Sequence, residues 1–192
     1  MSAPALNVRD FDGLTIPSPG TYAIDPAHTE VSAVVRHLMV SKVRGSFHNV
    51  TGTITVAEDP LQSSVTAEIP AETINTRVAD RDAHLRSADF LDVENHPTLS
   101  FRSTGVVKND GNEFVLRGEL SIRGVSREVD LAVEFDGVAG SPFGTEVIAF
   151  TATTEFDRED FGITWNQALE AGGVVVSKKV KVEIHAEAIR QQ

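Results

Sequence analysis

Apolar and polar residues alternate with a period of two along most of the chain after residue 20. Such alternation is typical of β-strands that bury one face and expose the other. The pattern predicts about eight strands, at residues 31–37, 46–56, 65–69, 99–103, 114–122, 129–135, 148–156 and 180–188. In the second of these, Val50 falls out of step with Phe47, and we expect a bulge or bend near Gly52 to restore the face.

Short connections separate the predicted strands. Residues 109–112 read Asn-Asp-Gly-Asn, a sequence typical of a hairpin turn because these residues tolerate positive φ. Glycine and proline residues between 137 and 144 predict a further loop. A run of about eight strands joined mostly by short turns favours an antiparallel barrel, since closure removes exposed sheet edges.

One segment departs from the alternation. Residues 80–91 contain good helix formers and no β-branched residue, and Leu85, Ala88 and Leu91 follow at intervals of three. Asp80 suits the helix start and Asp82 its first turn. The sequence therefore predicts an all-β, antiparallel eight-stranded barrel with a short helix between strands.

The residues assigned to the inner faces are small for such a barrel. They are mainly Val, Ala, Ile and Leu, aromatic residues make up only 6% of the chain, and Ala33, Ala67, Gly118, Ala149 and Ala152 are expected to leave space at the axis. An empty space of this kind destabilises a protein by about 24 cal/mol per Å³, and an apolar ligand would recover that loss. The alternative is a barrel that its phenylalanines fill.

Composition narrows the possible functions. The net charge of −11 argues against nucleic acid and against electrostatic docking on anionic lipids. The chain has no cysteine, and no stretch reaches the roughly 18 apolar residues that a membrane-spanning helix needs, so we expect no membrane insertion. Residues 1–20 lack the features of a signal peptide and are interpreted as an N-terminal extension before a domain of residues 21–192. We therefore expect a cytoplasmic protein.

Several motifs resemble the YceI-like family, whose members are often called polyisoprenoid-binding proteins. The residues that carry the resemblance are YAIDP at 22–26 with His28, HLMVS at 37–41, RDAHLRSADF at 81–90, HPTLSF at 96–101 and GELSIRGV at 118–125. The resemblance spans about residues 20–189. It implies a lipocalin-like barrel that holds a long isoprenoid or another amphiphilic lipid in a deep apolar pore, and it makes a homodimer plausible.

The candidate ligand-binding residues lie mainly on or near the predicted helix. An arginine there suits a polar lipid head, because its planar fork matches phosphate or carbonyl acceptors. The alternatives are a surface pair between Asp82 and Arg86, a structural His84, and aromatic rings that are plain core. The residues expected to bind the ligand are His37, Phe47, Arg81, Asp82, His84, Leu85, Phe90, Phe101 and Trp165.

The sequence offers little for catalysis or for a metal. None of the six histidines has the spacing of a zinc motif, and no nucleophile elbow, phosphate-binding loop or dinucleotide fingerprint is present. The acidic run around Arg158 is interpreted as a solvated loop. We expect neither cofactor nor metal and favour lipid carriage or storage. The alternatives are an enzyme acting on an isoprenoid lipid through His84, His37 or Asp82, and a stress-related barrel without ligand.

Overall fold

The computed structural model describes residues 5–192, most of which are β-strands. The chain has a single α-helix in this range, α1 (Ala79–Arg86), and three short 3-10 helices, η1 (Pro60–Gln62), η2 (Ala71–Thr73) and η3 (Arg158–Phe161). The strands are β1 (Val8–Phe11), β2 (Leu14–Pro17), β3 (Gly20–Ile24), β4 (Glu30–His37), β5 (Ser41–Phe47), β6 (Thr51–Val56), β7 (Ser64–Pro70), β8 (Thr98–Lys108), β9 (Glu113–Ile122), β10 (Val125–Gly140), β11 (Glu146–Asp157) and β12 (Lys179–Arg190).

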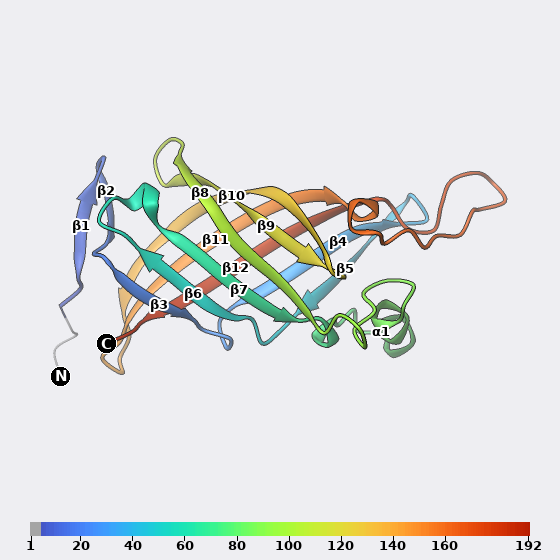
Figure 1. Ribbon diagram of the computed structural model, residues 1–192, viewed down its shortest axis with the longest axis horizontal. Coiled ribbons are helices and arrows are strands. Elements are labelled where there is room, and N and C mark those ends of the chain that lie inside the picture. The colour runs from blue at the N-terminus through green and yellow to red at the C-terminus, as the bar shows by residue number, and fades with distance from the viewer. Residues whose placement is uncertain (1–4) are drawn as a thin grey trace.

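Eight of these strands close into an antiparallel barrel (Figure 1). Hydrogen-bonded neighbours follow the order β11-β10-β9-β8-β7-β6-β3-β12, and the pairing of β11 with β12 closes the ring. The predicted barrel with one short helix between strands is therefore confirmed. No helix among residues 5–192 combines the length and apolar character needed to cross a bilayer.

The hairpin of β4 and β5 extends the barrel wall beyond β3. Strand β12 pairs with β3 through residues 188–190 and with β4 through residues 181–185, so β3 and β4 follow one another along the same neighbour. The single strand predicted at 46–56, with a bulge or bend near Gly52, is wrong. An irregular connection at residues 48–50, with Asn49 at a φ of 58°, separates β5 from β6, and the two strands pair with different partners.

The N-terminal extension contains regular structure. Strands β1 and β2 form a small antiparallel sheet of their own at one end of the barrel, the end at which the C-terminus lies (Figure 1). Arg9 ties this hairpin to the turn before β7 through the carbonyl groups of Ala57 and Glu58, at 2.6 Å each. Residues 1–4 of the predicted extension lie outside the described residues.

Helix α1 lies at the opposite end of the barrel (Figure 1). It ends at Arg86, earlier than the predicted Leu91, and the chain continues through turns to Asn95. Asp80 does not cap the helix: Val78 occupies the N-cap position and makes no side-chain cap. The Asp82 carboxylate instead accepts hydrogen bonds from the backbone N–H of Thr76, at 2.8 Å, and from its hydroxyl, at 2.5 Å, which fixes the helix to the preceding segment.

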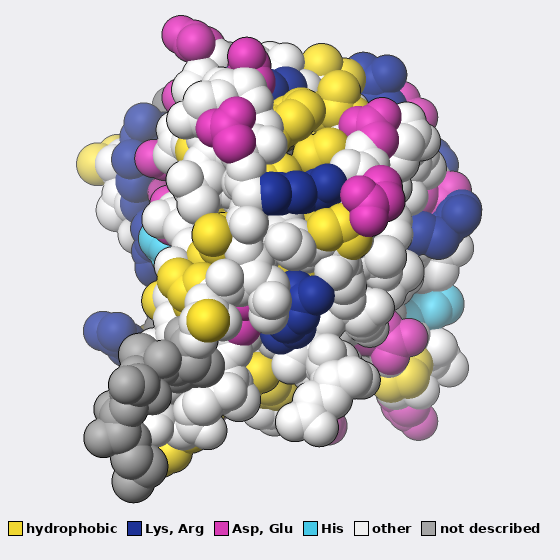
Figure 2. Space-filling model, turned by 90° about the vertical axis from the view of Figure 1, so that its left-hand side faces the viewer, with side chains coloured by type: hydrophobic (Ala, Val, Ile, Leu, Met, Phe, Trp, Pro, Cys, Tyr) yellow, Lys and Arg dark blue, Asp and Glu magenta, His cyan; other side chains and the backbone are white. Residues whose placement is uncertain are grey.

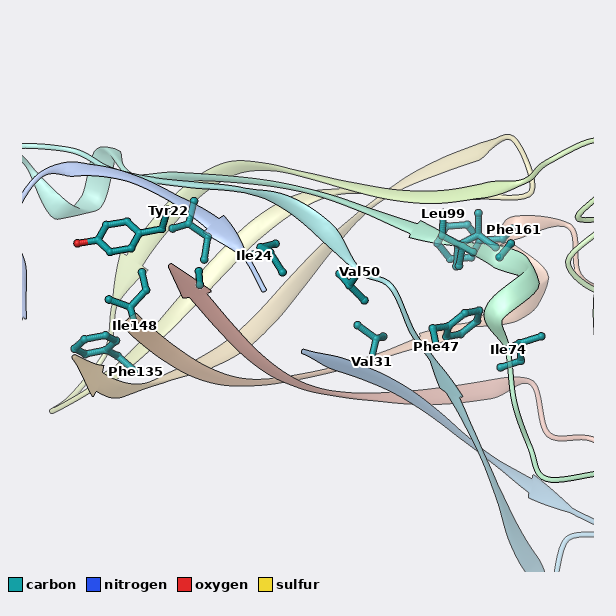
Figure 3. Close-up of a cluster of buried hydrophobic side chains, with 14 of the residues drawn as sticks. Tyr22, Ile24, Val31, Phe47, Val50, Ile74, Leu99, Phe135, Ile148 and Phe161 are labelled. Atoms are coloured by element: carbon teal, nitrogen blue, oxygen red, sulfur yellow. The ribbon is translucent and has the colours of Figure 1, made fainter. Parts of the chain in front are cut away.

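Buried apolar side chains lie along the whole length of the barrel. Figure 3 shows Tyr22, Phe135 and Ile148 near the β1–β2 end, and Phe47, Ile74, Leu99 and Phe161 toward the α1 end. Phe47, Leu99, Phe135 and Ile148 come from strand faces that the alternation of the sequence assigned to the interior, whereas Tyr22, Ile74 and Phe161 lie outside the predicted strands.

Candidate functional site: an apolar tunnel along the barrel

A tunnel of about 540 Å³ runs inside the barrel. Side chains from both ends line it, from Ile16 of β2 and Pro60 of η1 to His84 of α1. The predicted inner faces all contribute, as in Val31, Ala33 and Val35 of β4, Val129, Leu131, Val133 and Phe135 of β10, and Val180, Val182, Ile184 and Ala186 of β12. A barrel filled by its phenylalanines, the alternative considered above, is therefore wrong for this chain.

Small residues make room for the tunnel, although two of those expected to do so act differently. Ala33, Ala67 and Ala152 line it as predicted. Gly118 is covered by the ring of Phe101, which itself lines the tunnel. Ala149 does not line it, because it alternates with the inward-facing Ile148 and Phe150 and therefore points outward.

Aromatic and imidazole rings gather where the tunnel reaches helix α1. The His84 ring centroid lies 4.7 Å from that of Trp165 and 5.0 Å from that of Phe90, in edge-to-face geometry. The Phe90 and Trp165 rings are 5.3 Å apart. All three side chains line the tunnel, and a ring nitrogen of His84 lies 2.8 Å from the Asp89 carboxylate. Together they form a semi-polar rim on an otherwise apolar cavity.

The structure brings most of the predicted ligand-binding residues to one cavity. The residues of that set that line the tunnel are His37, Phe47, Arg81, His84, Leu85, Phe90, Phe101 and Trp165. They are drawn from β4, β5, α1, the turns after α1, β8 and the segment before β12. Contact with a ligand remains a prediction for each of them.

Asp82 is the exception, and both interpretations of it need correction. Its carboxylate is buried against Thr76 and does not line the tunnel, so it is positioned to hold the helix. The surface pair with Arg86 does not form either. Arg86 donates to the carbonyl groups of Glu72, at 2.8 Å, and Ile74, at 2.9 Å. Arg81 does line the tunnel, and it too is held by Thr76, through the hydroxyl at 2.7 Å and the carbonyl at 2.9 Å.

Arg158 is a tunnel residue that the sequence analysis missed. We expected it in a solvated acidic loop, yet it is 3% exposed and lines the tunnel from η3. Its guanidinium donates to the carbonyl groups of Ser177 and Ile163, at 2.9 Å each, and burial lowers its pKa. The alternation of β11 contained the signal, because Thr154, Phe156 and Arg158 continue its inner face.

The charged side chains that line the tunnel share one sign. Arg36, Arg81 and Arg158 line it together with His37 and His84, and no aspartate or glutamate of the described residues does so. They come from the end of β4, from α1 and from η3, which lie at the same end of the barrel (Figure 1). In a chain with a net charge of −11, this basic lining is a local property of one end of the cavity.

Near the β1–β2 end, the barrel interior contains a buried polar cluster beside the tunnel. The Tyr22 hydroxyl donates to the Glu146 carboxylate at 2.7 Å, and Arg190 contacts both groups, at 2.7 and 3.2 Å. Burial, together with the adjacent carboxylate, raises the pKa of Tyr22 to about 12. Burial alone would raise the pKa of Glu146, but the Asn7 amide, Tyr22 and Arg190 outweigh it and lower that pKa.

On the outer surface, three side chains lie close enough to share a metal ion. Asp25, His28 and Glu187 each offer one possible ligand atom, a carboxylate oxygen or an imidazole nitrogen, and these three atoms lie within 4.8 Å of one another. Their present contacts are a 2.7 Å hydrogen bond between His28 and Asp25 and a 3.7 Å approach of His28 to Glu187. That hydrogen bond raises the pKa of His28 and lowers the pKa of Asp25. The expectation of no metal, based on histidine spacing, did not consider this group because Glu187 is remote in sequence.

Comparison with known proteins adds three findings. Residues 22–188 match the YceI-like domain family. A UPF0312 protein of Staphylococcus aureus is 38% identical over 171 residues, which cover 86% of this chain and 95% of that protein. The fold is shared with Burkholderia cenocepacia BcnA (TM-score 0.73, 19% identity, 85% and 98% coverage) and with a polyisoprenoid binding domain from Saccharophagus degradans (TM-score 0.67, 12% identity, 88% and 98% coverage).

Proposed function

This chain belongs to the YceI-like family, and from that premise we propose that its tunnel binds a long apolar or amphiphilic lipid, a polyisoprenoid such as a prenyl phosphate or a quinone, for carriage or storage. The Saccharophagus degradans protein that shares the fold is described as a polyisoprenoid binding domain. The observation that carries the proposal is the cavity of about 540 Å³, lined almost throughout by aliphatic and aromatic side chains.

The energetics favour a long chain over a compact ligand. Each buried CH₂ group gains about 0.8 kcal/mol, so a prenyl or alkyl tail that fills the tunnel binds tightly with little polar help. An elongated cavity that runs from β2 and η1 to α1 fits such a tail better than it fits a rounded ligand. The tail therefore supplies the affinity, and the wall needs no specific polar contact along most of its length.

The head group of the lipid is assigned to the α1 end of the tunnel. Arg81, His84, Trp165 and Arg158 line that end, and arginine offers planar donors to phosphate or carbonyl oxygen. At the other end, the lining is formed by residues such as Ile16, Pro17, Pro60 and Val56, which present no charge. The polarity of the lining thus supports one orientation, with the tail pointing toward β1 and β2.

The titratable side chains that line the tunnel favour lipid binding over catalysis. An enzyme acting on the lipid would need an acid and a base that face the substrate. His84 is paired with Asp89 and reaches the tunnel, but Asp82 is turned toward Thr76, and no carboxylate among the described residues lines the cavity. The enzyme hypothesis would therefore depend on histidine alone.

A bulky residue placed inside the tunnel tests the proposal. Ala152 is 6% exposed and lines the cavity, so Ala152→Phe fills space that the tail would occupy. We expect native mass spectrometry and organic extraction to find lipid bound to the unmodified protein and little or none bound to the variant. The fold should survive, because the added ring enters an existing cavity.

Ala149 provides the matched control on the same strand. It points away from the tunnel, so Ala149→Phe should retain the lipid. Uptake of added prenyl phosphates, quinones and fatty amides would be measured for all three proteins. Purified protein that contains no lipid and takes up none of these compounds would overturn the proposal, as would equal uptake by Ala152→Phe and the unmodified chain.

A further inference from the structure

The tip of the β4–β5 hairpin exposes three consecutive apolar side chains. Leu38, Met39 and Val40 are 42%, 54% and 83% exposed, and none of them lines the tunnel. Exposed apolar residues that follow one another at a loop tip are a common feature of surfaces that enter the interface of a lipid bilayer. In Figure 1 this hairpin projects at the α1 end, beyond the closed part of the barrel.

The hairpin tip has a defined conformation. Leu38 and Met39 have positive φ values of 52° and 61°, a region that residues without a polar side chain rarely occupy. The tip is braced by the segment before β12, since Leu38 donates its N–H to the Val175 carbonyl at 2.9 Å and His37 forms a bridge with Val176. The structure therefore holds these apolar side chains outward at some cost in backbone strain.

Local charge complements an anionic bilayer even though the whole chain is acidic. No aspartate or glutamate occurs between Val31 and Ala57, whereas Arg36, Lys42 and Arg44 lie on the hairpin. Arg44 pairs with Glu183 at 2.7 Å, but Arg36 and Lys42 form no ion pair with any described residue. The one acidic side chain on the bracing loop is Glu170. Net charge had led us to set electrostatic docking aside, but it is an average over the surface and this hairpin departs from it.

Charge also distinguishes the hairpin tip from the β1–β2 end of the barrel. The β1–β2 end exposes apolar side chains as well, Val107 at 61% and Phe143 at 91% among them. Acidic residues surround that end, however, and its cations are engaged, with Lys108 paired to Asp12 and Arg9 to Glu58. Figure 2, which faces this end, shows both acidic and basic side chains around the apolar ones. Among the described residues, Arg36 and Lys42 of the hairpin have no acidic partner, and this difference favours anionic lipid at the hairpin.

We propose, on the basis of the lipid-binding function above, that the β4–β5 hairpin tip docks the protein on an anionic lipid bilayer and places the tunnel mouth at the membrane surface. The tip continues directly into the tunnel wall, because Arg36, His37 and Val43, which flank it, line the cavity. A lipid that leaves the bilayer beside the tip therefore meets Arg36 and His37 first and the apolar interior of the tunnel next. The docked orientation agrees with a head group held at the α1 end.

A second copy of the chain fits this surface less well than a bilayer. Strand β5 is an edge of the sheet, which invites pairing with another strand. Its inner part is already occupied, since Ser46 exchanges two backbone hydrogen bonds with Asn75. Lys42 and Arg44 lie on the remaining edge, and charged residues at such positions oppose strand addition.

Vesicle flotation of the full chain tests the proposal. The probes are vesicles of phosphatidylcholine alone and of phosphatidylcholine mixed with phosphatidylglycerol. We expect binding to the anionic vesicles that weakens as salt is raised. The tip variant carries Leu38→Asn, Met39→Asn and Val40→Ser, and it keeps the turn because asparagine tolerates positive φ. It should bind the anionic vesicles about tenfold or more weakly, because the free energy gained by burying three apolar side chains of this size exceeds the 1.4 kcal/mol of a tenfold change.

The matched control carries Val107→Ser and Phe143→Ser at the opposite end and should bind vesicles like the unmodified chain. Equal vesicle binding by the tip variant and the unmodified chain would overturn the proposal, and so would light scattering that shows the tip variant to have lost a dimer.

Native mass spectrometry of bound lipid distinguishes the docking proposal from the lipid-binding proposal. Vesicle binding without any tunnel lipid would remove the binding function alone, and tunnel lipid without tip-dependent vesicle binding would remove the docking alone.

Discussion

Single side chains in this protein often take their role from partners that are remote in sequence. Tyr22 and Glu146 are 124 positions apart and share a 2.7 Å hydrogen bond inside the barrel. Arg190 adds a charge-assisted bond to each of them, so neither polar group is left unsatisfied on burial. The cluster joins β3, β11 and β12 near the point where the last two strands close the ring.

The titration of Tyr22 gives a direct test of this cluster. Tyr22 is the only tyrosine of the chain, so the ultraviolet absorbance of tyrosinate reports on it alone. We expect a midpoint at a pH of about 12 rather than at the ordinary value of 10.0. Because the folded-state pKa is raised, stability is intact below the unfolded value and declines as the pH rises toward 12.

Glu146→Gln is the companion variant. It removes the negative charge that disfavours tyrosinate, so the midpoint should fall below that of the unmodified chain but remain elevated through burial. Circular dichroism at the same pH values confirms that folded protein is being titrated. A midpoint at the ordinary tyrosine value while the protein is still folded would show that the cluster does not form.

At the scale of elements, the shape of the tunnel depends on close packing between strands β8 and β9. Gly118 of β9 pairs with Ser103 of β8, and the ring of Phe101 covers it. A Cβ atom at position 118 would collide with that ring and would lie 2.6 Å from the Arg102 carbonyl oxygen. The glycine thus allows a large ring to lie flat against the sheet instead of projecting into the cavity.

Gly118→Ala should therefore destabilise the protein by about 1–3 kcal/mol, the usual effect of overpacking, and displace Phe101 toward the tunnel. Gly105→Ala on β8 is the control, because a Cβ atom there meets nothing within 4 Å. Urea unfolding of both variants measures the difference in the free energy of unfolding. Equal stability of the two variants would contradict the packing described for Phe101.

At the scale of the whole molecule, a barrel with an empty interior forgoes contacts that a bound lipid would supply. Most buried apolar side chains of the core also line the tunnel, and a few, such as Tyr22, Ile148 and Phe161, do not. A ligand that binds the folded state alone stabilises it by mass action, by about 2.7 kcal/mol at a concentration of 100 times its Kd. Stability and lipid content are therefore expected to be linked.

Removal of lipid should lower the melting temperature. Protein stripped by organic extraction and refolded is expected to melt below the lipid-loaded form, and to regain the difference when lipid is restored. Scanning calorimetry on matched samples measures this, with Ala152→Phe as the control whose filled tunnel should make it insensitive to lipid. Identical melting of stripped and loaded samples would argue against occupancy of the tunnel.

The sequence by itself determined the strand faces, the helix and the apolar character of the interior. These features depend on residues near one another in the chain, because alternation with a period of two assigns each side chain to a face without knowledge of its neighbours. The motif at residues 81–90 likewise indicated Arg81 and His84, which the fold brings to one cavity with the predicted His37 and Trp165. Even Arg158 was within reach of the alternation of β11, had it been followed beyond Phe156.

Only the tertiary structure decided what depends on barrel closure. It separated β5 from β6, turned the Asp82 carboxylate toward Thr76 and left Arg86 to bind backbone carbonyls. It also joined Tyr22 to Glu146 and Arg190, and placed residues that flank the β4–β5 hairpin tip, Arg36 and His37, in the tunnel lining. The physical reason is that these contacts link segments whose separation in sequence carries no local signal, so their geometry exists only once β11 and β12 have closed the ring.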